Sequence, residues 1–115
     1  MRRGEIRLVD LAPARGAEAD KQRPAVVVSN DGANAAADRL GRGVITVVPV
    51  TSNVEKIYPF QVRLLAADTG LRIDSKAQAE QVRSVAVERV GRRVGKLTPE
   101  TVEALDEALR LHLAL

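Results

Sequence analysis

An unbroken apolar run between polar ends stands near the first quarter of the chain: Arg23-Pro24-Ala25-Val26-Val27-Val28-Ser29-Asn30. Its β-branched residues, without polar alternation over residues 25–28, predict a strand that is buried on both faces. Pro24 lacks an N–H group, which a strand tolerates at its first position, where we place it. A strand of this kind requires partners on either side, so we expect a sheet built around it.

The flanking sequence supplies those partners. Further segments with strand character lie at residues 5–11, 43–50, 60–64, in short polar pieces within 73–85, and at 91–97. The piece at 60–64 alternates, with Phe60, Val62 and Leu64 on one face. Asp68-Thr69-Gly70 predicts a turn, and residues 33–40 suit either a short helix or irregular structure.

The final segment has the marks of a helix. Thr98 is a good N-cap, Pro99 suits the first helical position, and Glu100 favours the positive end of the helix dipole. An apolar stripe at helical spacing follows: Val102, Leu105, Leu109 and Leu113. We therefore predict one domain over residues 1–115, of the mainly β (α+β) class. Its architecture would be a small antiparallel sheet or partly open barrel with a C-terminal helix.

Composition excludes several classes of protein. The chain has no cysteine, no apolar run of about 18 residues and no apolar segment behind its basic N-terminus. We therefore expect a cytoplasmic protein that does not enter a membrane. The formal net charge is +3, and five basic residues fall within 83–96 against one acid, Glu88. This surplus is compatible with a polyanionic partner, but composition alone favours an ordinary solvated surface.

The residue inventory limits the chemistry. His112 is the only histidine, so a pair of histidines or a triad with histidine is not available. The acidic residues show no metal-ligand spacing and no glycine-rich phosphate loop is present, so we expect no metal and no cofactor. RNA suits the groups that remain, because its 2′-hydroxyl is the nucleophile. Arginine can clamp the phosphate oxygens, and a threonine hydroxyl can donate to the same charge.

Three blocks of the sequence resemble the MazF/PemK family of toxins, in the family's order. They are Arg3-Gly4-Glu5-Ile6 with Val9-Asp10-Leu11 and residues 23–30, then Val48-Pro49-Val50-Thr51-Ser52, then Lys76-Ala77-Gln78-Ala79-Glu80-Gln81-Val82-Arg83-Ser84. The resemblance runs from about residue 2 to the C-terminus. It implies a small SH3-like β-barrel of the CcdB/PemK type and a homodimer. The implied activity is metal-independent, sequence-specific cleavage of single-stranded RNA that leaves 2′,3′-cyclic phosphate and 5′-hydroxyl ends.

The resemblance also assigns roles to individual residues. Arg23 is implied to be catalytic, with Thr51 as its partner, although Thr51 would equally satisfy backbone groups in a turn. The base is either a carboxylate such as Glu18 or a water molecule, because arginine stays protonated near neutral pH. Expected substrate-binding residues are Gln81, Glu80, Arg83, Ser52, Glu18 and, by stacking on bases, Tyr58.

The same resemblance implies a protein partner. This would be a MazE-like antitoxin whose flexible acidic tail occupies the basic groove, with operator DNA bound only through the antitoxin complex. Two other functions remain open: a CcdB-like poison of DNA gyrase, and a nucleic-acid-binding module without cleavage. A gyrase poison would tolerate Arg23→Ala, whereas the nuclease would not. One departure from the family is Arg7, which stands where its members usually carry an aromatic residue.

Overall fold

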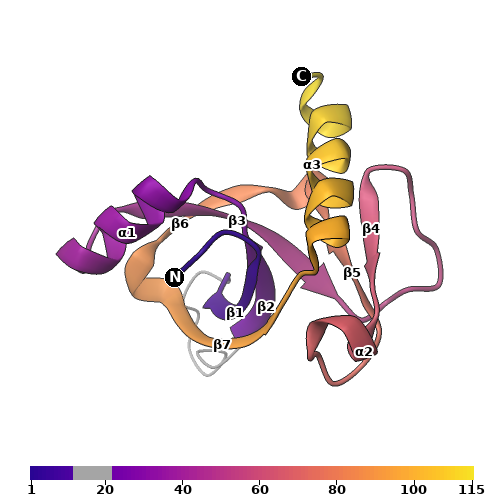
Figure 1. Cartoon of the computed structure of the whole chain (residues 1–115), viewed down its shortest axis with the longest axis horizontal. Coiled ribbons are helices and arrows are strands. Elements are labelled where there is room, and N and C mark those ends of the chain that lie inside the picture. Colours follow the sequence, from indigo (N-terminus) through magenta and orange to yellow (C-terminus); the bar gives the residue numbers. More distant parts are fainter. Residues whose placement is uncertain (12–21) are drawn as a thin grey trace.

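The computed structural model describes residues 1–11 and 22–115. These residues form a curved antiparallel sheet with a helix on each side (Figure 1). The strands are β1 (Glu5–Asp10), β2 (Gln22–Val27), β3 (Val44–Thr51), β4 (Gln61–Leu64), β5 (Ser75–Gln78), β6 (Arg83–Ala86) and β7 (Val90–Lys96). The α-helices are α1 (Asp31–Leu40), α2 (Ala66–Thr69) and α3 (Pro99–Leu113), and the 3₁₀ turns are Ala79–Gln81 and Val87–Arg89.

The sheet order is β4-β5-β3-β2-β1-β7, and β6 also pairs with β3. The mainly β class with a C-terminal helix is therefore confirmed. Within the described residues, the ladder runs from β4 to β7 without closing on itself. None of the helices in this part of the chain is long and apolar enough to cross a membrane.

The central strand β2 is buried on both faces, as its sequence predicts. Val26 packs into one apolar cluster, under α3, whereas Ala25 and Val27 pack into a second cluster that includes Ala37 of α1. β3 divides in the same way, with Val48 in the first cluster and Val47 in the second. Because successive side chains of a strand point to opposite faces, the unbroken apolar runs serve two cores at once.

We predicted that Pro24 occupies the first position of its strand, but it occupies the third. It lies opposite Leu8 of β1, while the pairing of β2 with β3 begins only at Ala25. Pro24, which lacks an N–H group, therefore lies beside the end of the β2–β3 ladder, where it disrupts little of the hydrogen bonding between these strands.

Both long helices begin as their capping residues dictate. Thr98 Oγ1 accepts a hydrogen bond of 3.2 Å from the Thr101 N–H, and Leu105 and Ala108 are buried, which confirms the predicted helix. Of the four residues in the predicted apolar stripe, only Leu113 is exposed, because the last turn of the helix extends beyond the sheet. Residues 33–40 resolve to helix, since Asn30 Oδ1 accepts from the Ala33 N–H over 2.8 Å at the start of α1.

The predicted turn at residues 68–70 belongs to a short helix, α2, which packs on the last strand. Gly70 ends α2 with a φ of 86°, a conformation that favours glycine. A Cβ atom on Gly95 of β7 would lie only 2.4 Å from the Thr69 carbonyl oxygen. The absence of a side chain at Gly95 therefore allows α2 to lie directly against β7.

Candidate active site

A surface hollow of about 560 Å³ lies where β2 begins, β3 ends and the chain leaves α2. We call it the Arg23 hollow. Its lining residues are Arg23, Pro24, Val50, Thr51, Ser52, Leu71, Arg72, Ile73 and Ser75. Three of the predicted site residues therefore meet here: Arg23, Thr51 and Ser52.

Strand register explains why Arg23 and Thr51 face the same space. Ala25 of β2 lies opposite Pro49 of β3. The same antiparallel register, continued by two residues, brings Arg23 opposite Thr51 at the end of the ladder. The Arg23 side chain is exposed, and within the described residues it makes no hydrogen bond or ion pair. Its donors are therefore available to a phosphate group.

Thr51 fulfils part of the alternative role that its sequence suggested. Its Oγ1 accepts a hydrogen bond of 3.2 Å from the Asn53 N–H, which orders the turn after β3. A hydroxyl that accepts one bond still has its own proton to donate. Thr51 can therefore hold the turn and donate to a ligand in the Arg23 hollow. Ser52, directly after it, is exposed.

The Arg23 hollow also contains residues that the sequence analysis missed. Arg72 adds a second exposed guanidinium, and Ser75 contributes a buried hydroxyl group that donates to the Ile73 carbonyl over 3.0 Å. The pairing of Thr51 with Lys76 brings β5, and hence Ser75, beside β3. Arg72 and Ser75 reach the Arg23 hollow only because β5 pairs with β3. No local motif around Arg72 predicts this pairing.

The electrostatics of the Arg23 hollow are those of an anion site. Among the residues that the structure describes, its lining includes two arginines and no aspartate or glutamate. Within the described part of the chain, no group of three or more histidine, cysteine, aspartate or glutamate side chains is positioned to hold a metal ion. The described charges at this site are two guanidinium groups, which can bind phosphate oxygens in pairs.

Tyr58 lies outside the Arg23 hollow, in a neighbouring one of about 500 Å³. That second hollow is lined by Asn53, Glu55, Lys56, Tyr58 and Lys76. The Tyr58 ring stacks on Phe60 with centroids 5.3 Å apart, and Lys56 Nζ lies 4.9 Å from its centroid. The ring that we expected to stack on bases is thus already in contact with both neighbours.

Glu80 has a structural partner rather than a place in the Arg23 hollow. Its Oε2 accepts a hydrogen bond of 2.7 Å from Gln61 Nε2. Gln61 is only 8% exposed, so a residue on the polar side of the predicted alternation over residues 60–64 is nevertheless buried. The amide is buried because Glu80 and the Tyr58 N–H both bond to it.

The remaining predicted substrate residues are dispersed. Gln81 is exposed at the end of the 3₁₀ turn Ala79–Gln81, and Arg83 donates from Nη1 to the Leu11 carbonyl over 2.9 Å. Neither lines the Arg23 hollow. Glu18 lies outside the described residues. The structure thus brings together only part of the predicted site within one chain.

Comparisons with known proteins identify the family of the chain. The model of the family described as "PemK-like, MazF-like toxin of type II toxin-antitoxin system" matches residues 2–113. The chain is 68% identical to Endoribonuclease MazF9 of Mycobacterium tuberculosis over its whole length and 98% of that protein. It is 32% identical to Endoribonuclease EndoA of Bacillus subtilis, over the whole chain and 96% of that protein.

Solved structures show the same fold. A mycobacterial endoribonuclease in complex with its cognate antitoxin matches with a TM-score of 0.76 at 23% identity, over the whole chain and 96% of that protein. MazF from Deinococcus radiodurans matches with a TM-score of 0.74 at 23% identity, over the whole chain and 97% of that protein. By its sequence match over residues 2–113, the chain belongs to the PemK-like, MazF-like toxins of type II toxin–antitoxin systems.

Proposed function

We propose that this MazF-family endoribonuclease cuts single-stranded RNA in the Arg23 hollow, sequence-specifically and without a metal ion, and thereby inhibits translation. The observation that carries the proposal is the meeting of Arg23 and Thr51 in one hollow that also holds Arg72. The curated relatives named endoribonucleases support the reaction class.

The reaction needs three things from the protein: alignment, charge stabilisation and proton transfer. The 2′-oxygen attacks the adjacent phosphorus and the bond from phosphorus to the 5′-oxygen breaks, which leaves a 2′,3′-cyclic phosphate and a 5′-hydroxyl. The Arg23 guanidinium holds two phosphate oxygens, and the Thr51 hydroxyl donates to the charge that develops on them. Both donors are available, as their contacts show.

Two protons must move. The Arg23 guanidinium is suited to stabilise the departing 5′-oxygen, which takes its proton from a water molecule in the hollow. The residues described around the hollow include no carboxylate or histidine. The 2′-hydroxyl proton therefore passes to a water molecule or to a carboxylate from residues 12–21, such as Glu18.

Substrate contacts outside the hollow complete the proposal. Ser52 and Arg72 lie beside the scissile phosphate. Gln81, Glu80, Arg83 and Tyr58 retain their proposed roles only where RNA extends beyond the hollow, or where they belong to a second subunit. Their dispersion within one chain is consistent with a groove that two subunits build together.

The decisive experiment incubates the protein with long single-stranded RNA in EDTA and maps the ends. We expect discrete cuts that leave 5′-hydroxyl ends, lost in Arg23→Ala and retained in Arg39→Ala. Arg39 is an exposed arginine at the end of α1, away from the hollow, so it controls for the lost charge. Cleavage that persists in Arg23→Ala would reject the assigned site, and cleavage that EDTA abolishes would reject the metal-free mechanism.

A homodimer is part of the proposal, because the last turn of α3 and the residues after it leave apolar side chains in solvent. Leu111, Leu113 and Leu115 are 58%, 47% and 84% exposed. Leu113 and Leu115 also line a groove of about 380 Å³ with Val28, Val82 and Leu109. We expect Leu113→Asp to halve the mass measured by light scattering. Leu40→Asp, at a similarly exposed leucine on α1, should leave it unchanged.

The antitoxin is the second proposed partner, acting where the protein and its RNA are found, in the cytoplasm. An acidic tail from a MazE-like antitoxin would enter the Arg23 hollow and exclude RNA, because both ligands present negative charge to Arg23 and Arg72. Operator DNA would be bound only through that complex. We expect added salt and Arg23→Ala each to weaken antitoxin binding.

A further inference from the structure

Two more hollows are lined in part by the chain segment that also lines the Arg23 hollow. Different residues of segment 68–73 line the three hollows: Leu71, Arg72 and Ile73 line the Arg23 hollow, Thr69 lines the second, and Asp68 lines the third. The second, which we call the Arg93 hollow, has a volume of about 350 Å³. The third, the Arg2 hollow, has a volume of about 450 Å³.

β7 supplies the opposite wall, and its cations face both of the additional hollows. Arg93 and Lys96 each line the Arg93 hollow and the Arg2 hollow. Both side chains are exposed, and within the described residues neither forms a hydrogen bond or an ion pair. Gly95 allows the backbone at Thr69 to approach β7 closely, so the two walls lie side by side.

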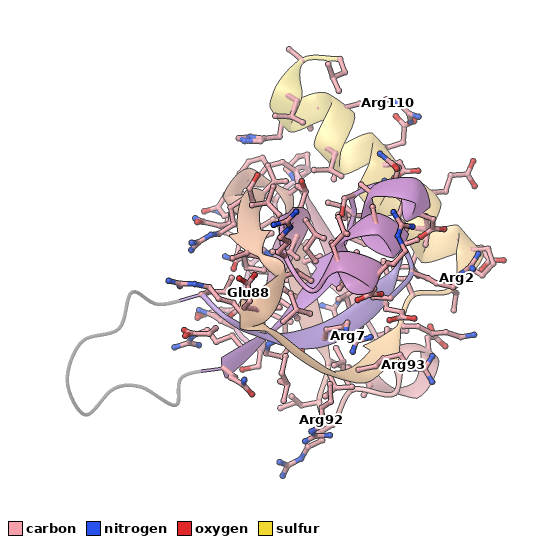
Figure 2. The ribbon with its side chains drawn as sticks, turned by 90° about the vertical axis from the view of Figure 1, so that its left-hand side faces the viewer. Arg2, Arg7, Glu88, Arg92, Arg93 and Arg110 are labelled. Atoms are coloured by element: carbon pink, nitrogen blue, oxygen red, sulfur yellow. The ribbon has the colours of Figure 1, made fainter. Side chains whose placement is uncertain are left out.

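The N-terminal segment adds further positive charge. Arg2, 79% exposed in its side chain, has only a long contact of 3.7 Å with Asp31, whereas Arg3 is paired with Asp106 at 2.7 Å. Figure 2 shows Arg2 and Arg93 along the same edge of the molecule, with Arg92 extending away at its lower end. The Arg2 hollow thus has at least three cations available to a ligand: Arg2, Arg93 and Lys96.

Two acidic residues also line the Arg2 hollow, and they differ in effect. Glu5 is neutralised by Arg7, whose Nη1 lies 2.8 Å from its Oε1. Asp68 is exposed, and its side chain has no bond or ion pair within the described residues. Asp68 is therefore the one lining acid whose charge opposes an anionic ligand directly.

We propose that these hollows form a track for the RNA backbone, which runs from the Arg23 hollow along residues 68–73 to Arg93, Lys96 and Arg2. The track binds phosphates of nucleotides beyond the cut, without reading bases, because its free groups are charges on flexible side chains. This inference rests on the proposal that the scissile phosphate lies in the Arg23 hollow. It predicts that long RNA is a better substrate than the cleavage motif alone.

The test compares kcat/KM for two RNAs: a short oligonucleotide limited to the mapped cleavage motif, and a long RNA with the same single motif in unstructured flanks. In Arg93→Ala/Lys96→Ala we expect the ratio of kcat/KM for the long RNA to kcat/KM for the short RNA to fall about tenfold at low salt. We call this the long-to-short ratio. The plot of log(kcat/KM) against log salt concentration for the long RNA should become shallower by about 1.4. Each of the two lost phosphate contacts accounts for about 0.7 of this change. The short RNA should be cut as before.

Two further variants separate the track from net charge and from damage to the fold. Arg39→Ala/Arg42→Ala removes the same charge from exposed positions that line none of the three hollows, so the ratio should not change. Asp68→Asn should raise the ratio, a direction that misfolding cannot mimic. An unchanged ratio in Arg93→Ala/Lys96→Ala, an equal fall in Arg39→Ala/Arg42→Ala, or a flat or lower ratio in Asp68→Asn would each overturn the track.

The two proposals fail separately. If Arg23→Ala still cuts RNA, the assigned active site is wrong, but a lower long-to-short ratio in Arg93→Ala/Lys96→Ala would still locate backbone binding at β7. If Arg23→Ala is inactive and the ratio does not change, the active site stands and the track is rejected.

Discussion

Gln61 donates from its side-chain Nε2 to a carboxylate oxygen of Glu80 across 2.7 Å, and both groups lie beneath the loop that carries Tyr58. The same amide accepts from the Tyr58 N–H through its Oε1 over 3.1 Å. The other oxygen of Glu80, Oε1, is buried and has no partner among the described residues. Gln61 is therefore the group that fixes this loop to the 3₁₀ turn before β6.

We expect Gln61→Leu to lower the free energy of unfolding by about 1–3 kcal/mol, because it leaves the Glu80 carboxylate without its donor. Urea unfolding measures the loss. Glu80→Leu alone leaves the Gln61 amide unpaired, whereas Gln61→Leu/Glu80→Leu removes both groups. The double variant should therefore lose less than the sum of the single losses. Strictly additive losses would show that the two side chains do not support one another.

This pair also shows where sequence reasoning stops. The unbroken runs in β2 and β3 predicted central strands correctly, because burial on both faces leaves a direct mark on composition. The alternation of residues 60–64 did not indicate that Gln61 is buried, because its partner Glu80 stands 19 residues away. From sequence alone, a polar side chain is predicted to be exposed unless its hydrogen-bond partner is known.

In the candidate site, too, some residues were identified from the sequence and others were not. Arg23 and Thr51 were identified from resemblance, and the register of Ala25 with Pro49 shows why they are neighbours. Arg72 and Ser75 were not foreseen, because they reach the Arg23 hollow only through the pairing of β5 with β3. Non-local strand pairing is set by the whole sheet and leaves no local signal.

Thr51→Val should separate the two roles of this residue, since it removes the hydroxyl and keeps the shape. We expect its single-turnover cleavage rate to fall about 100-fold, the usual cost of losing one donor to a developing oxyanion. Stability should fall by less than about 1 kcal/mol, because the bond from the Asn53 N–H is exposed to solvent. Thr51→Ser, which keeps the hydroxyl, should retain most of the rate. Equal rate losses in both variants would indicate a purely structural role.

Gly95→Ala should disturb the contact between β7 and α2. The new methyl group would lie 2.4 Å from the Thr69 carbonyl oxygen, so α2 must move away. We expect a loss of about 1–3 kcal/mol, typical of overpacking, seen as a lower thermal midpoint. Cleavage of long RNA should fall more than that of short RNA, since α2, which lines the Arg93 and Arg2 hollows through Thr69 and Asp68, shifts. An unchanged midpoint would show that α2 moves at no cost.

Asp31 gives the fold a dependence on acid. The hydrogen bond of 2.6 Å from the Arg3 N–H, with smaller contributions from Asn34 and from the charges of Arg2 and Arg3, holds the pKa of the Asp31 carboxyl below its usual 3.8, although desolvation opposes this. The unfolded chain therefore binds this proton more tightly than the folded one. The resulting stabilisation is fully present above about pH 4 and is lost as pH falls through the lower folded pKa.

Asp31→Asn tests this directly, because an asparagine oxygen still accepts from the Arg3 N–H but carries no charge. We expect the wild type to be the more stable of the two near neutral pH. The difference in urea midpoint should shrink steadily below about pH 4, and comparing the two proteins cancels the titration of every other carboxylate. Added salt should leave most of the difference, because a hydrogen bond outweighs the screened charges. A difference that grows toward acid pH would mean that folding raises the pKa of Asp31, contrary to the geometry at Arg3.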